Sequence, residues 1–210
     1  MLFVVGVALA LVVGRLAGGR IERLTALGAR WWWAALIALG LQLLVVYGPR
    51  ELLDGAAVPL IVASHVALLA VALRNWRLTG AAIAGLGIAL NLAVMLANGG
   101  SMPVAPETLA RAGRVEAWKI GDGSVGTRLA QSKDVILPAD QTRLEPLADR
   151  YWTHLPGRLS ILFSVGDLVL LAGVVTLTVR GMTRIPIPPE DPDELQRPVQ
   201  PRRSEIAAAG

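Results

Sequence analysis

TGAAIAGLGIALNLAVMLA, residues 79–97, contains no charged side chain and is long enough, as a helix, to cross the hydrocarbon core of a lipid bilayer. Four other apolar runs nearly or fully reach the same length: residues 1–16, 31–47, 58–73 and 159–179. Short connections that contain arginine join the first four runs. This layout predicts an all-α, polytopic transmembrane helical bundle of about five spans, with the lipid bilayer as its surroundings.

The composition supports a membrane protein and excludes several kinds of site. Of 210 residues, 54% are hydrophobic and 17% charged, and the mean hydropathy is +0.55, which is too apolar for a soluble domain of this size. The chain has no cysteine and only two histidines, so we expect no disulfide, no metal centre and no cofactor. The net charge of +4 lies mostly beside helix ends, where arginine serves topology, so no nucleic-acid partner is expected.

The distribution of basic residues over the short connections predicts the orientation. The connection 17–30 and the connection 74–78 are rich in arginine, whereas the connection 48–57 has only Arg50, beside Glu51 and Asp54. Because basic residues mark the cytoplasmic side, we expect the N-terminus outside and the C-terminus in the cytoplasm. The predicted location is the plasma (inner) membrane, with the chain passing through it several times.

Two segments lie outside the predicted spans. Residues 98–158 form a long extracytoplasmic loop in which Pro106 and Gly113 bracket a short helix over 106–112. A second helical piece is predicted along the membrane surface, because four apolar residues share one helical face: Leu144, Leu147, Ala148 and Tyr151. The tail 180–210 is proline-rich and carries mixed charge, so we expect it to be disordered on the cytoplasmic side.

Polar residues inside the predicted spans fall into one layer near the outer ends. Counted from those ends, Gln42, His65, Asn91 and Asp167 lie roughly 7 to 12 Å deep. A carboxylate in lipid is costly, so Asp167 should face the bundle interior or a hydrated cavity. Ser160, Ser164 and Asp167 would form a polar stripe on the last helix.

This layer has two interpretations. One is an outward-facing polar pocket for a small ligand or ion, with Asp167 as proton-exchanging group or anchor and His65 as relay. The other is that these residues hydrogen-bond across helices and only set the packing. The candidate ligand-binding residues are Asp167, His65, Asn91, Asn98, Gln42 and Ser164.

The stretch Gly121–Gly126 matches GxGxxG, the pattern of dinucleotide-binding loops. No buried strand precedes it and the loop has no room for a βαβ unit. A nucleotide site is therefore not expected there.

Several segments together resemble an uncharacterised bacterial family of multi-pass membrane proteins, the domain of unknown function numbered 5317. They are NGGSMPV at residues 98–104, TRL at 142–144, LADR at 147–150 and SVGD at 164–167. The resemblance runs from the first helix to about Gly173. It implies a multi-pass protein with a sizeable loop before the last helix, and it implies no activity. This chain has Lys133-Asp134 where the family is expected to carry Lys-His.

Three functions remain open at this point. The chain could bind or move a small ligand or ion, or act as a non-catalytic scaffold with protein partners or a homo-oligomer. A membrane-embedded enzyme at the outer face, with Asp167, Asp149 or His65 in acid-base roles, is the least favoured, because no paired-carboxylate or nucleophile motif supports it and no residue is assigned as catalytic.

Overall fold

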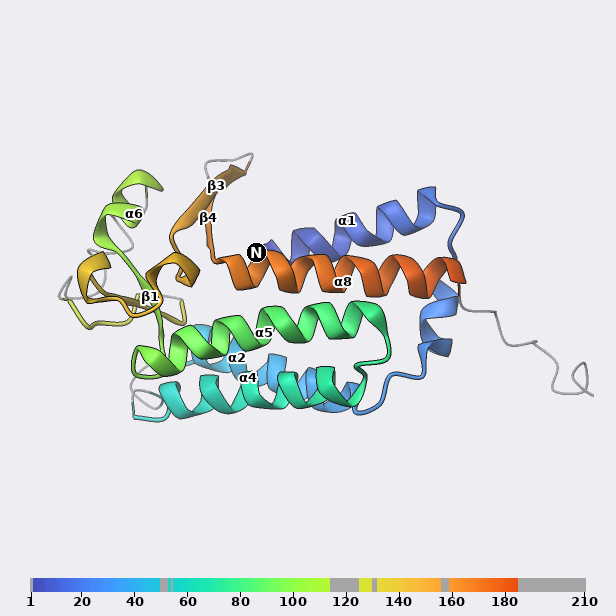
Figure 1. Ribbon diagram of the computed structural model, residues 1–210, viewed down its shortest axis with the longest axis horizontal. Helices are drawn as coiled ribbons and strands as arrows, with labels where there is room; N and C mark the ends of the chain where they lie inside the picture. Colours follow the sequence, from blue (N-terminus) through green and yellow to red (C-terminus); the bar gives the residue numbers. More distant parts are fainter. Residues whose placement is uncertain are drawn as a thin grey trace, which may run out of the picture.

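The computed structural model describes residues 2–49, 53, 55–113, 125–129, 132–155 and 159–184. Five long helices lie side by side and alternate in direction along the chain (Figure 1). They are α1 (Leu2–Leu16), α2 (Trp32–Tyr47), α4 (Ala57–Arg74), α5 (Thr79–Ala97) and α8 (Val165–Arg184). A 3-10 helix, η1 (Ile21–Leu27), joins α1 to α2.

The described helices differ in how well they suit a membrane. Three, namely α4, α5 and α8, are long and apolar enough to cross one. A fourth span is counted if η1 and α2, which meet at 106°, are taken as one broken span. The apolar part of α1, Gly6–Leu16, is shorter than a full span. The bounds of α5 coincide with the predicted run 79–97. α2 begins one residue later than its predicted run, and α4 is one residue longer than its predicted run at each end.

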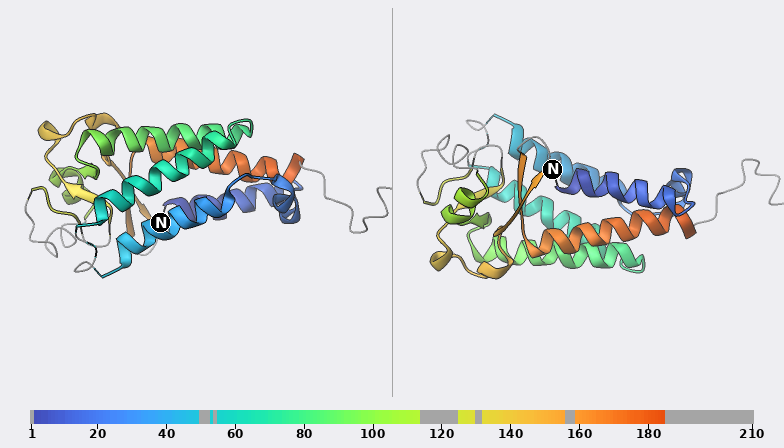
Figure 2. Two further views of the ribbon diagram at one scale, coloured as in Figure 1. Left: turned by 90° about the horizontal axis from the view of Figure 1, so that it is seen from below. Right: turned by 90° about the horizontal axis from the view of Figure 1, so that it is seen from above.

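The region between α5 and α8 folds over one end of the bundle, and we call it the cap (Figure 2). It contains one α-helix, two 3-10 turns and four strands in the part that the structure describes. These are β1 (Met102–Val104), α6 (Pro106–Arg111), β2 (Asp134–Ile136), η2 (Ala139–Gln141), η3 (Glu145–Leu147), β3 (Tyr151–Leu155) and β4 (Leu159–Phe163). β1 pairs with β2 in parallel and β3 with β4 in antiparallel. The fold is therefore mostly helical but not all-α.

The start of the last helix was predicted wrongly. Residues 159–163 form β4 instead of the first turns of a span, and α8 begins at Val165 and continues to Arg184. Residues 159–163 pair along their whole length with β3, so their side chains alternate between the two faces of the hairpin. The rings of Tyr151 and Phe163 stack, with their centroids 5.9 Å apart. Hydropathy cannot separate this apolar strand from the helix that follows it.

The second helical piece predicted over 144–151 is also wrong. Only the short turn η3 forms there, and Tyr151 already belongs to β3. Ala148 is buried in a core that joins cap and bundle, with Leu147 packed against it. The short helix expected over 106–112 is present as α6. Of the predicted tail, residues 180–184 belong to α8 and residues 185–210 lie outside the described residues.

The closest helix pair is α5 with α8, because small residues line the contact. A methyl group added at Gly80 or Gly87 of α5 would collide with the backbone of α8, and one at Gly173 of α8 would collide with Ala84 of α5. Backbones in such contact place short side chains from both helices within hydrogen-bonding distance. The polar site described next lies at the cap end of this contact.

Candidate functional site

Three polar residues form a closed hydrogen-bonded group where α8 begins, and we call it the Asn91 ring. Asn91 Nδ2 donates to Asp167 Oδ1 at 2.7 Å, and Ser164 Oγ donates to Asn91 Oδ1 at 2.8 Å. The backbone N–H of Asp167 donates to Ser164 Oγ at 3.0 Å, and that of Ser164 donates to Asp167 Oδ2 at 3.2 Å. Asn91 and Ser164 are fully buried.

The reciprocal bonds between Ser164 and Asp167 are a capping box. Ser164 precedes the first helical residue, and Asp167 is the third residue of the helix. The carboxylate also lies at the positive end of the helix dipole, which stabilises its charge. Asp167 is therefore held in place by the start of its own helix as well as by Asn91.

Gly166 leaves the space that Asn91 occupies. A Cβ at this position would lie 2.7 Å from Asn91 Cγ and 2.9 Å from the carbonyl oxygen of Gly87. Within SVGD, Ser164 caps the start of α8, Gly166 allows the close approach of Asn91, and Asp167 accepts a hydrogen bond from α5. Each of these three residues therefore has a structural role.

The depth predicted for Asp167 along its own helix was wrong. Because α8 begins at Val165, Asp167 lies only about 3 Å from the helix start rather than about 12 Å. It still meets Asn91, six residues before the end of α5, because α5 extends beyond the start of α8 toward the cap (Figure 1). Ser160 lies in β4 beside His154 Nδ1, at 2.9 Å, so the predicted stripe Ser160–Ser164–Asp167 does not form.

Two of the remaining candidates belong to α2 and α4. Gln42 Nε2 donates to Ser64 Oγ at 3.1 Å, which links α2 to α4. His65 Nδ1 is 2.8 Å from the carbonyl oxygen of Ile61 and therefore donates to it. His65 is buried, and Asp167 and Lys133 act on it electrostatically.

Asn98 joins α5 to the cap backbone. Its Nδ2 donates to the carbonyl oxygens of Val94 and Arg143, both at 2.8 Å, and its Oδ1 accepts from the N–H of Arg143 at 2.9 Å. Both the nitrogen and the oxygen of the Asn98 side chain are therefore hydrogen-bonded to backbone groups. Asn98 thus holds the cap on the bundle.

The cap contributes two buried carboxyl groups, Asp134 and Asp149, which we call the carboxyl pair. Asp134 was not selected from the sequence, and Asp149 was named only as an acid-base group of the enzyme alternative. β1 lies between them: Asp134 is in register with Met102 on one side, and the N–H of Asp149 donates to Pro103 on the other at 3.3 Å. Asp134 is 6% exposed and Asp149 is 3% exposed. Their carboxyl groups lie within hydrogen-bonding reach of each other.

The carboxyl pair is short of hydrogen-bond donors. Ser132 Oγ donates to Asp134 Oδ2 at 2.6 Å. Oδ1 of Asp134 and Oδ1 of Asp149 are buried, and no donor among the described residues reaches either one. A proton on one carboxyl group would supply a donor to the other.

Burial, and after it the charge of Asp134, raises the pKa of Asp149, while Lys133 opposes the rise. Burial alone would lower the pKa of Lys133, but the charges of Asp167, Asp149 and Asp134 together raise it. Lys133 therefore carries its charge at neutral pH. Asp149 is the group whose protonation is most favoured.

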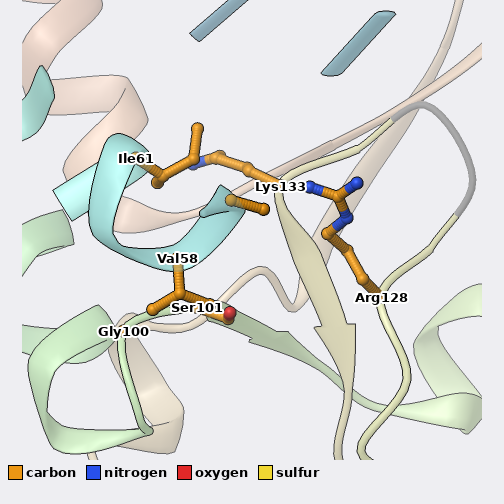
Figure 3. A pocket seen from close by; sticks show the side chains of 7 residues that line it. Val58, Ile61, Gly100, Ser101, Arg128 and Lys133 are labelled. Carbon is orange, nitrogen blue, oxygen red and sulfur yellow. The ribbon is translucent and has the colours of Figure 1, made fainter. Parts of the chain in front are cut away.

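Lys133 reaches from the start of β2 toward α4, with its amine directed at Ile61 (Figure 3). The space beside it has a volume of about 10 Å³, enough for one water molecule. It is lined by Val58, Gly100, Ser101 and Arg128, among others. The described residues therefore leave no room for a bound metabolite beneath the cap at this point.

Among the described residues, no three His, Asp or Glu side chains are arranged to hold a metal ion. Of the GxGxxG stretch, residues 121–124 lie outside the described part of the chain. Gly126 is followed by Arg128, which bridges Val135 in antiparallel fashion. In the described residues that come next, 127–129 and 132–136, there is no helix such as a dinucleotide loop would require.

The signal for Asp134 and Asp149 in the sequence was weak. Both lie in polar segments, where a carboxylate is exposed by default. The pair Lys133-Asp134 stood out only as a departure from the expected Lys-His. Asp149 stood out as part of the motif segment Leu147–Arg150 and as an acid-base group of the enzyme alternative. Neither observation places the two groups together.

The chain belongs to a family of unknown function (DUF5317), whose sequence profile it matches over residues 27–179. The match includes α2, α4, α5, the cap and most of α8, and therefore the Asn91 ring and the carboxyl pair. None of the curated proteins and none of the solved structures compared with the chain matches it.

Proposed function

We propose that this member of the family is a five-span membrane protein that binds and releases a proton at the carboxyl pair, beneath its cap. The five spans are α1, α2, α4, α5 and α8, in the plasma (inner) membrane. The N-terminus and the cap face outward and the tail faces the cytoplasm. The arginine-rich connections at the end opposite the cap support this orientation.

The observation that carries the proposal is the burial of two carboxyl groups on either side of β1, Asp134 at 6% and Asp149 at 3% exposure. Both act electrostatically on Lys133, as does the half-buried Asp167. Two of these carboxyl groups are within reach of each other and each has an oxygen without a donor among the described residues. Two adjacent carboxylates cannot both remain ionised at low cost, so one holds a proton.

The proton exchange follows from this arrangement. In the protonated state the hydroxyl of Asp149 donates to a carboxylate oxygen of Asp134. Loss of this proton to water leaves two neighbouring carboxylates that repel, with Lys133 compensating one charge. Repulsion then loosens the contact between β1, β2 and the Asp149 segment.

The consequence for stability has a definite sign. A raised pKa of Asp149 in the folded state means that its contribution to stability is complete below the unfolded value, about 3.9, and is lost as pH rises through the folded value. The raised pKa of Lys133 adds a contribution that is complete below about 10.4, so it does not vary near neutrality. The cap should therefore become less stable as the pH rises from acidic to neutral or alkaline.

The test is thermal unfolding of the purified protein in detergent across this pH range. Wild type should lose stability as the pH rises, and Asp149→Asn should remove most of that slope. Asp140→Asn is the matched control, because Asp140 is an exposed carboxylate of the same cap. An unchanged slope in Asp149→Asn would show that the pair does not bind the proton.

A scaffold is the second candidate, and the Asn91 ring favours it. All three members of the ring bond to one another, and the cavity beneath the cap beside Lys133 holds about one water. A scaffold would use the cap as a rigid surface for a protein partner or a second copy. Its signature is that partner capture survives Asp149→Asn and fails when exposed cap residues are changed.

A further inference from the structure

A second hollow lies at the opposite end of the bundle, and we call it the basic pocket. It lies where the connection from α4 to α5 meets the connection from η1 to α2, and its volume is about 380 Å³. Three arginines line it together with a glycine, an asparagine and a tryptophan: Arg30, Arg74, Arg77, Gly28, Asn75 and Trp76. Its size suits the headgroup of a phospholipid and is far above that of the cavity beneath the cap.

Asn75 fixes the two walls of the basic pocket to each other. Its Oδ1 accepts from the N–H of Arg30, and its Nδ2 donates to the carbonyl oxygens of Arg30 and Val71, all at 2.8 Å. The amide is 9% exposed. The backbone that carries Arg30 is thereby held against the end of α4, which carries Arg74. An arginine that only marks topology needs no such fixed spacing.

The basic pocket contains positive charge without a carboxylate. Among the described residues, none of its three arginines forms an ion pair, and Glu22 at this end pairs with Arg20 at 3.6 Å. The Arg77 guanidinium lies 5.8 Å from the Trp76 ring centroid. Three guanidinium groups around one hollow repel each other unless an anion enters, and their planar donors match phosphate oxygens.

The surroundings indicate that the anion belongs to a lipid. Trp32 and Trp76, each 62% exposed, and Leu73, also 62% exposed, lie close in sequence to the pocket arginines. Exposed tryptophan beside apolar helices is typical of the boundary between headgroups and acyl chains. Basic pockets between membrane helices on the cytoplasmic side bind anionic headgroups.

We propose that the basic pocket binds the phosphate of an anionic phospholipid, with Arg30, Arg74 and Arg77 as donors and the acyl chains against the apolar surface beside Leu73 and Trp76. The proposal does not depend on the carboxyl pair. It does depend on the helices lying in a membrane.

The test is lipid binding measured by native mass spectrometry of the detergent-purified full chain. Phosphatidylglycerol, phosphatidylcholine and inorganic phosphate are added separately to wild type, to Arg74→Gln/Arg77→Gln and to the control Arg15→Gln/Arg20→Gln. The control removes the same charge at the same end of the bundle, outside the pocket. Melting temperatures without lipid confirm that the variants are folded.

We expect selective binding of phosphatidylglycerol over phosphatidylcholine in wild type and in the control. In the pocket variant the affinity for phosphatidylglycerol should fall about 30-fold, as the loss of two charge contacts at a membrane surface predicts. Equal losses in both variants would overturn the proposal, since they would reflect net charge alone. Inorganic phosphate that displaces phosphatidylglycerol when it is titrated into the lipid-bound wild type would also overturn it, in favour of a site for a soluble anion. If Arg74→Gln/Arg77→Gln does not fold, Arg77→Gln is compared with Arg20→Gln by the same criteria.

Discussion

Replacing Gly166 by alanine tests whether the Asn91 ring is as tightly packed as its geometry implies. The added Cβ would lie 2.7 Å from Asn91 Cγ and 2.9 Å from the Gly87 carbonyl oxygen, both far inside van der Waals contact. Overpacking of this kind costs about 1 to 3 kcal/mol. Displacing the Asn91 amide also weakens its bonds to Ser164 and Asp167, at about 1 kcal/mol each.

The better helix propensity of alanine offsets at most about 1 kcal/mol. The net loss should therefore be about 2 to 5 kcal/mol, or several degrees in melting temperature for a chain of this size. The assay is thermal unfolding in detergent, monitored by the loss of helical circular dichroism. Gly40→Ala is the control, because nothing lies within 4 Å of a Cβ at Gly40, and it should be neutral or slightly stabilising.

A double-mutant cycle identifies the source of the loss. If the clash is with the amide, Gly166→Ala should cost at least about 1 kcal/mol less in an Asn91→Ala background. Equal melting temperatures for Gly166→Ala and wild type would refute the close packing of the ring. An equal cost in both backgrounds would place the clash at the Gly87 backbone instead.

Three further predictions concern Asp149 of the cap and two asparagines that hold neighbouring segments together, Asn98 and Asn75. Asp149→Asn should flatten the decline of melting temperature with rising pH. The raised pKa of Asp149 means that the folded wild type loses a proton from this group as the pH rises, whereas an asparagine amide does not titrate. Thermal melts across the pH range check this. Asn98→Ala should cost about 1 to 3 kcal/mol by leaving the backbone groups of Arg143 without partners, and limited proteolysis should then cut the cap faster than in wild type. Asn75→Ala should cost a similar amount of stability, about 1 to 3 kcal/mol, because the backbone of Arg30 loses two hydrogen bonds. Proteolysis of the cap should stay as in wild type. Faster cleavage of the cap would contradict the view that the two ends of the bundle are stabilised independently.

The apolar runs alone predicted α2, α4 and α5 to within one residue at each end. Residues 79–97 are helical to the residue, because an uninterrupted apolar run without charge has a stable solution in lipid that requires no distant partner. The hydrogen bond of Asn91 across helices was also predictable, since a buried amide must find a partner, whereas its role as a ligand-binding residue stays a prediction.

The start of α8 was readable in principle but was missed. Ser164 followed three residues later by Asp167 is the pattern of a capping box, and it places the helix start at Val165. Hydropathy extended the span to residue 159 because an apolar strand and an apolar helix have the same composition. The depth assigned to Asp167 followed from that error.

Only the tertiary structure decided which charges are buried together. Asp134 and Asp149 meet because β1 pairs with β2 on one edge and with the Asp149 segment on the other, and this pairing joins residues far apart in the chain. The basic pocket likewise depends on Asn75, which binds the backbone of Arg30 across 45 positions of sequence. Local composition fixes where a chain can enter a membrane, but the free energy of a buried charge depends on its neighbours in space, and those are set by the packing of the whole fold.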